Sequence, residues 1–225
     1  MTAVLDTRTW ADEGTGLLLA GLDRLTDADL DAPCALPGWS RRRLLAHVAS
    51  NAEAIGRLLT WARTGVETRM YASPDQRAAD IEAGAIRPDL RAWVAASADD
   101  LARAMDELTA KAWSAQVVTA QGRTVPASET PWMRARETCL HAVDLDAGTT
   151  FDDLAEGFLT ALLDDVTAWR SARQGPAIDL ITPRTRHEIT GDGTPRRVEL
   201  PLTGAAAWLT GRRPDPHLPT LPRWL

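Results

Sequence analysis

A helical repeat of apolar residues runs through the first three quarters of the chain and limits the folds open to it. Apolar side chains return every three to four positions in five segments, near 7–23, 40–63, 88–109, 131–147 and 152–173. Ser40 is predicted to cap the second segment, and Gly65 follows its end. Helices with one apolar stripe each must bury it against one another, so the sequence predicts a mainly α fold built as a helix bundle.

The residue composition changes near position 176, where Pro, Gly and Thr become frequent. The short β-prone runs RHEIT and RRVELPL are separated by GDGTP, which predicts a hairpin, and TGAAAWLTG predicts a short helix. Gln121 and Gly122 also separate two β-prone runs and favour a hairpin or an irregular crossing. We therefore expect a helix bundle over 1–175 and a small α/β domain with a Pro-rich tail over 176–225.

Charge and hydropathy argue against two classes of partner. The net charge of -6 disfavours a general nucleic-acid binder, because a phosphate backbone is bound by basic surfaces. No apolar run approaches the roughly 18 residues that would span a bilayer, and MTAVLDTRTWADEG does not resemble a secretion signal. With only Cys34 and Cys139 present, we expect a soluble protein of the reducing cytoplasm, without nucleic-acid or membrane partners.

Two helical segments carry residues with the chemistry of metal ligands. Glu137 and His141 lie four residues apart, so their side chains project from nearly the same helix face. His47 shares the interior face of its own helix with apolar residues. Two imidazoles and a carboxylate can bind a first-row metal ion and leave a coordination position open. An exposed Glu137–His141 ion pair and a core histidine at 47 fit the same spacing, and both interpretations remain open here.

Two residues next to these candidates have their own interpretations. Cys139 lies about 200 degrees around the helix from Glu137, so we expect it to pack in the core, away from any metal. Asp144 is on the stripe of His141. It could orient that imidazole, as metal-bound histidines commonly require, or face solvent as a carboxylate of the last helical turn.

Three stretches, taken together, resemble a known family. They are LPGWSRRRLLAHVA, RETCLHAVDLDAG and the closing GAAAWLTGR with the terminal LPRWL. In this order and spacing they resemble the mycothiol-dependent maleylpyruvate isomerase family of the DinB-like superfamily, essentially from end to end. The resemblance implies a DinB-like four-helix bundle with a small C-terminal α/β domain that helps to close the site. It also implies zinc, or another divalent metal, on His47, Glu137 and His141.

The resemblance further implies a reaction and its partners. The reaction would be cis to trans isomerisation of maleylpyruvate or a similar maleyl-type dioxo acid, with mycothiol as a recycled nucleophile. Thiolate addition would turn the double bond into a single bond, rotation would follow, and elimination would restore the alkene and the thiol. A dicarboxylate substrate needs a cationic anchor. The resemblance favours Arg212 in WLTGR for that role, with Arg223 in PRWL as the alternative to it, and a surface arginine is the competing interpretation.

Two other functions remain open on the sequence alone. A thiol S-transferase would use the same zinc and the same low-molecular-weight thiol but release an adduct with another electrophile. A non-catalytic, metal-stabilised bundle that binds a regulatory partner would instead have a closed or absent metal site. The three-ligand pattern, which leaves a coordination position free, favours an enzyme.

Overall fold

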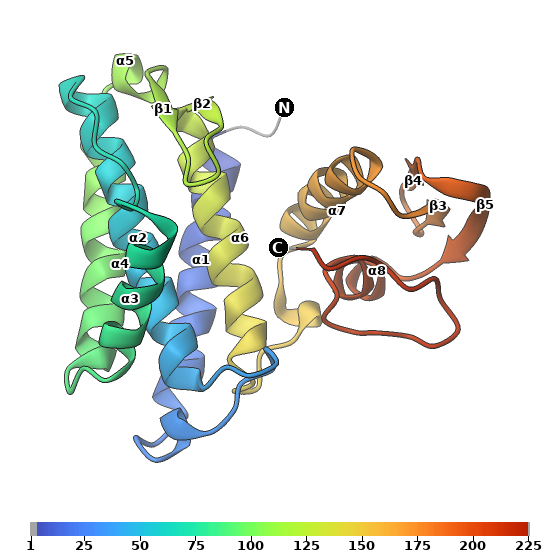
Figure 1. The fold of residues 1–225 in the computed structure, drawn as a ribbon, viewed down its shortest axis with the longest axis horizontal. Coiled ribbons are helices and arrows are strands. Elements are labelled where there is room, and N and C mark those ends of the chain that lie inside the picture. The colour runs from blue at the N-terminus through green and yellow to red at the C-terminus, as the bar shows by residue number, and fades with distance from the viewer. Residues whose placement is uncertain (1–3, 225) are drawn as a thin grey trace. The chain divides into compact units, whose positions relative to one another are not determined.

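The structure is a computed structural model that describes residues 4–224 (Figure 1). The chain divides into two compact units, of which the first ends at Thr149 and the second begins at Thr150. Within the described part of the chain, no helix combines the length and the apolar character needed to cross a membrane.

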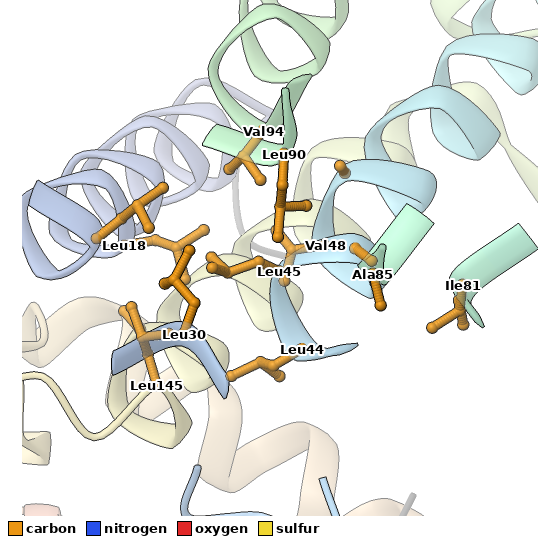
Figure 2. Packing of buried hydrophobic residues seen from close by; sticks show 14 residues of the cluster. Leu18, Leu30, Leu44, Leu45, Val48, Ile81, Ala85, Leu90, Val94 and Leu145 are labelled. Carbon is orange, nitrogen blue, oxygen red and sulfur yellow. The ribbon is translucent and has the colours of Figure 1, made fainter. Parts of the chain in front are cut away.

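The first unit is a four-helix bundle, as predicted. Its long helices are α1 (Val4–Asp23), α2 (Arg41–Thr64), α4 (Leu90–Asp106) and α6 (Thr130–Asp144). Helix α1 packs along α6 and α2 along α4, while α2–α6 and α1–α4 contacts close the bundle (Figure 1). Figure 2 shows the apolar side chains of these helices meeting in one core, among them Leu18, Leu45, Val94 and the nearby Leu145. The apolar stripes read from the sequence are therefore the faces that the bundle buries.

The ends of the ligand-bearing helices follow local sequence chemistry. The Ser40 side chain accepts a hydrogen bond from the backbone N–H of Arg43, and Gly65, which follows the last residue of α2, has φ of 76°. That left-handed conformation is one that glycine adopts without a steric penalty. Pro131 stands in the first turn of α6, where its missing N–H is not needed. The sequence predictions for Ser40 and Gly65 are confirmed.

Shorter elements connect the long helices. They are η1 (Asp29–Asp31), α3 (Pro74–Ala85), α5 (Ala110–Trp113), β1 (Gln116–Val118), β2 (Thr124–Pro126) and η2 (Ala127–Glu129). Strands β1 and β2 form an antiparallel hairpin, which settles the choice between a hairpin and an irregular crossing.

Helix α3, which packs against α2, was not predicted from the sequence. Its apolar face is narrow, since its buried residues are Ile81, Gly84 and Ala85. Gly84 permits the close approach, because a Cβ at this position would lie 2.6 Å from the ring of Trp93 and 3.1 Å from the Cβ of Ala46. Tertiary packing thus stabilises a helix that has little amphipathic signal of its own.

The second unit contains η3 (Phe151–Asp153), α7 (Glu156–Ser171), β3 (Pro176–Ile181), β4 (Arg186–Ile189), β5 (Asp192–Glu199) and α8 (Leu202–Leu209). Its sheet has the order β4-β3-β5, with β4 antiparallel and β5 parallel to β3. The predicted hairpin between RHEIT and RRVELPL is therefore wrong. Most of GDGTP belongs to β5, and Asp192 donates its backbone N–H to the carbonyl of Gly175 at 2.7 Å, which starts β5 beside β3.

The domain boundary also differs from the expected 175/176. Helix α7 packs on α8 and β4 and so belongs to the second unit. Its Arg170 donates from Nε to the carbonyl of Leu209 at 3.1 Å and from Nη1 to that of Pro222 at 3.1 Å. The helical period at 152–173 predicted the helix, but periodicity does not indicate which partner buries its apolar face.

Candidate metal centre

Three side chains that the sequence singled out meet within the first unit. His47 comes from α2, and Glu137 and His141 come from α6. One donor atom from each lies within 4.8 Å of the others. Glu137 Oε2 is 2.9 Å from His47 Nε2 and 3.2 Å from His141 Nε2. The fold thus brings together, across two helices, a donor set that the sequence shows only as separate pieces.

A buried arginine links the two ligand-bearing helices. Arg134, about one turn before Glu137, donates from Nη1 to the carbonyl of Val48 at 2.8 Å and to Asn51 Oδ1 at 3.0 Å. Val48 follows His47 directly, so the link lies next to both ligand-bearing turns. Burial lowers the pKa of Arg134 to about 10, against the opposing effect of the Glu137 charge, and the side chain stays cationic at neutral pH.

Asp144 contacts His141 at Nδ1, the ring nitrogen that does not face Glu137. Its carboxylate is fully buried, and Oδ2 accepts a hydrogen bond from His141 Nδ1 at 2.9 Å. A proton on Nδ1 leaves the lone pair of Nε2 directed at the site, which is the tautomer a metal ligand requires. Of the two interpretations of Asp144, the structure supports the one in which it orients His141.

The electrostatics of the three residues favour an ionised carboxylate beside the imidazoles. Burial works to raise the pKa of Glu137, but the interactions with His47 and His141 outweigh it and hold the pKa well below its ordinary value. Burial lowers the pKa of His47, which favours the neutral ring. For His141, burial is outweighed by the hydrogen bonds to Asp144 and Glu137, and its pKa is raised.

The donor set fits a divalent first-row metal ion. Two imidazole nitrogens and one carboxylate oxygen converge, and three protein ligands leave room for a further ligand. The side chains of His47 and His141 are 7% and 13% exposed, while that of Glu137 is 31% exposed. Glu137 is therefore the most exposed of the three side chains, whereas both imidazoles are nearly enclosed.

Sequence reasoning missed two polar residues beside this centre, Arg77 on α3 and Tyr71 just before it. Arg77 Nη2 lies 3.4 Å from His47 Nδ1, and its guanidinium carbon is 5.6 Å from the centre of the Tyr71 ring. Ser73 followed by Pro74, a cap and a first-turn proline, was the available signal for α3.

Neither cysteine of the chain is an activated thiol. Cys139 is buried and its Sγ donates to the carbonyl of Trp10 at 3.4 Å, so it packs in the core as predicted. Burial raises its pKa to about 12. Burial also raises the pKa of Cys34, and both side chains are free thiols. A thiolate at this centre would therefore have to come from another molecule.

The two candidate anchors lie in the second unit. Arg212, just after α8, donates from Nη1 to the carbonyl of Thr210 at 3.1 Å, and its guanidinium carbon is 5.9 Å from the ring centre of Trp224. Arg223 lines a surface pocket with Trp169 and Ile189. Their role as carboxylate anchors remains a prediction.

Known proteins match the chain along its whole length. A family model described as the mycothiol maleylpyruvate isomerase N-terminal domain matches residues 11–146. The crystal structure of a mycothiol-dependent maleylpyruvate isomerase is 39% identical, with a TM-score of 0.92 and coverage of 100% of both chains. A histidine-to-alanine mutant of a mycothiol-dependent maleylpyruvate isomerase matches with 38% identity, the same TM-score and the same coverage. Among curated protein sequences, none matches.

Proposed function

Because the chain belongs to the mycothiol-dependent maleylpyruvate isomerase family, we propose that it is a zinc-dependent isomerase that converts maleylpyruvate, or a similar maleyl-type dioxo acid, from the cis to the trans form. Mycothiol would be its recycled thiol cofactor. One observation carries the metal dependence, the convergence of His47, Glu137 and His141 on one point of the bundle.

The chain's own residues have defined roles in this proposal. His47 and His141 would each offer an imidazole nitrogen and Glu137 an ionised oxygen, while Asp144 would fix the tautomer of His141. A zinc ion held there would lower the pKa of a nearby thiol and make its thiolate available at neutral pH. The buried imidazoles limit the access of bulk water, so the developing charge would lie in a medium of low dielectric constant.

The state of the two cysteines supports an external thiol. Both are at least half-buried, and burial raises the pKa of each, so neither serves as the nucleophile. Free thiols and a thiol cofactor both fit a reducing compartment, and we therefore propose a cytoplasmic location.

Metal analysis tests the centre directly. We expect about one zinc per chain in the purified protein, and a sharp loss in His47→Ala, Glu137→Ala and His141→Ala. His217→Ala is the matched control, because His217 is exposed in the C-terminal tail and should leave metal content unchanged. Helical circular dichroism should survive in all four variants, since the bundle core does not depend on the metal. Full metal retention in the three ligand variants would refute the site.

Measuring how much mycothiol is consumed per turnover distinguishes an isomerase from an S-transferase. An isomerase regenerates mycothiol, so catalytic amounts should convert many equivalents of maleylpyruvate into the trans isomer. A transferase would consume one thiol per turnover and release a stable adduct. A non-catalytic bundle would show neither result, and the 31% exposure of Glu137 already argues against the closed site that it requires.

We propose Arg212 as a carboxylate anchor of the substrate. Its removal in Arg212→Ala should cost about 2 to 4 kcal/mol of transition-state stabilisation, or roughly 30-fold to 1000-fold in kcat/KM. Arg212→Lys should recover part of the loss, because a point charge replaces a planar fork. A loss confined to Arg223→Ala, with equal zinc content in all variants, would assign the anchor to Arg223 instead.

A further inference from the structure

The second unit contains a small pocket whose walls are mostly apolar. It is formed by the end of α7, the start of β3, the end of β4 and the tail of the chain, and its volume is about 190 Å³. A cavity of roughly 150 Å³ is large enough to bind one benzene molecule. The pocket can therefore take a molecule of that size with a small substituent. Its apolar lining consists of Trp169, Pro176, Ile178, Ile189, Leu221 and Pro222.

A buried arginine fixes the tail as one wall of this pocket. Arg170 is 5% exposed, and it donates from Nε to the carbonyl of Leu209 and from Nη1 to that of Pro222, both at 3.1 Å. On the strands, Ile178 and Ile189 are partners in the register of β3 and β4. The walls are thus held by hydrogen bonds from α7 and within the sheet, and the pocket is a built feature of the second unit.

The charged side chains of the lining all have one sign. Within residues 4–224 they are Arg170, Arg173 and Arg223, and no carboxylate lines the pocket. Arg173 packs on Trp169, with its guanidinium carbon 4.0 Å from the ring centre and its Nη1 donating to the Trp169 carbonyl at 3.1 Å. In the same described range, neither Arg173 nor Arg223 forms an ion pair with a carboxylate. An anion bound here would meet cations without having to displace a carboxylate.

Burial separates the apolar part of the pocket from the cationic part. Ile178 and Ile189 are 1% and 4% exposed, whereas Arg173 and Arg223 are exposed. The two isoleucines therefore line the inner part of the pocket, and the two guanidinium groups lie at its mouth. This arrangement suits a molecule that is apolar at one end and negatively charged at the other.

We propose that this pocket binds a small carboxylate whose apolar body is about the size of a benzene ring. The ring packs in the inner part, and the carboxylate pairs with Arg173 and Arg223 at the mouth, where a planar guanidinium can donate two parallel hydrogen bonds. The lining residues belong to the second unit and the metal ligands to the first. The inference therefore does not rest on the proposed function.

Calorimetric titration of benzoate into the zinc-loaded protein, without mycothiol, tests the cationic part of the site. Arg173→Met keeps a side chain on Trp169 and should weaken benzoate binding by roughly 5-fold to 15-fold, the lower range for a hydrogen bond to a charged group, because water screens an exposed cation. Arg197→Met is the matched control, since it removes the same charge from a side chain that is 68% exposed and outside the pocket. Arg223 stays unchanged in these variants, because it is also the alternative anchor for the substrate.

A second variant tests the apolar part of the site. A Cβ at Gly175 would lie 3.5 Å from Pro222, an ordinary packing distance, so Gly175→Leu should fold and place its side chain among the lining residues. Benzoate binding should fall sharply in Gly175→Leu and much less in Gly175→Ala, with thermal denaturation to show that both variants are folded. Benzyl alcohol, which has the ring without the charge, should bind wild type more weakly than benzoate.

A metal-ligand variant distinguishes this pocket from the metal centre. His141→Ala should bind benzoate as wild type does, because His141 does not line the pocket. Loss of binding in His141→Ala with wild-type affinity in Arg173→Met would place benzoate at the metal centre and overturn the proposal. Absence of benzoate binding to the folded wild type would overturn it as well, and so would equal affinities in wild type, Arg173→Met and Gly175→Leu.

Discussion

Replacing Asp144 by asparagine removes the negative charge behind His141 and keeps the size of the side chain. Asp144 is fully buried and accepts from His141 Nδ1 at 2.9 Å. The amide oxygen of asparagine can still accept this hydrogen bond, so the ring should keep its orientation. The substitution should lower the basicity of the His141 ring. A charged carboxylate accepts a stronger hydrogen bond from the imidazole N–H than a neutral amide oxygen does.

The expected size of this effect follows from the nature of the bond. A hydrogen bond to a charged group contributes about 1.5 to 3 kcal/mol and a neutral one about 1 kcal/mol. The difference, about 0.5 to 2 kcal/mol, corresponds to a loss of roughly 2-fold to 30-fold in zinc affinity. This range overlaps the loss of about 10-fold to 100-fold that usually follows when the partner of a ligating histidine is removed.

Competition with a chromophoric chelator measures zinc affinity in the wild type and in Asp144→Asn. Asp146→Asn is the matched control, since it makes the same chemical change two residues later on a side chain that is 72% exposed. Asp146 has φ of 54°, a conformation that asparagine tolerates well, so the control should fold normally. Equal zinc affinities in the three proteins would show that Asp144 does not tune the centre.

Two further predictions concern stability. Gly14→Ala should destabilise the bundle by about 1 to 3 kcal/mol, because a Cβ would lie 2.6 Å from the Sγ and 2.7 Å from the backbone N of Cys139. Gly16→Ala should instead stabilise α1 by up to about 1 kcal/mol, because nothing lies within 4 Å of a Cβ at this position. Equal changes in unfolding free energy for the two variants, measured by urea denaturation, would contradict the close packing at Gly14. In the metal-free protein, the lowered pKa of Glu137 contributes stability that is complete above the ordinary value of 4.5 and is lost as the pH falls. The difference in unfolding free energy between metal-free wild type and Glu137→Gln should therefore shrink on acidification below about pH 4.5, and a difference that grows would contradict the sign of the shift.

Local sequence patterns determined much of the first unit. The repeat of apolar residues predicts the long helices and their buried faces, since one helix turn relates positions three and four apart. Ser40 and Gly65 mark the ends of α2, because capping and left-handed backbone are properties of single residues. The spacing of Glu137 and His141 places both on one face, and the family motifs add His47 to them.

Tertiary structure alone decided which faces meet. Contact between α2 and α6 brings His47 to Glu137, and the same packing leaves Asp144 buried against His141 and not in solvent. Helix α7 joins the second unit and β5 pairs with β3 because the partner of an apolar face depends on the rest of the chain. Arg77 reaches the centre on a helix with little sequence signal, since its position depends on close packing at Gly84. Sequence periodicity shows which face of a single helix is apolar. A site formed by two helices also depends on which helices pack together, and that is decided by the free energy of packing of the whole fold.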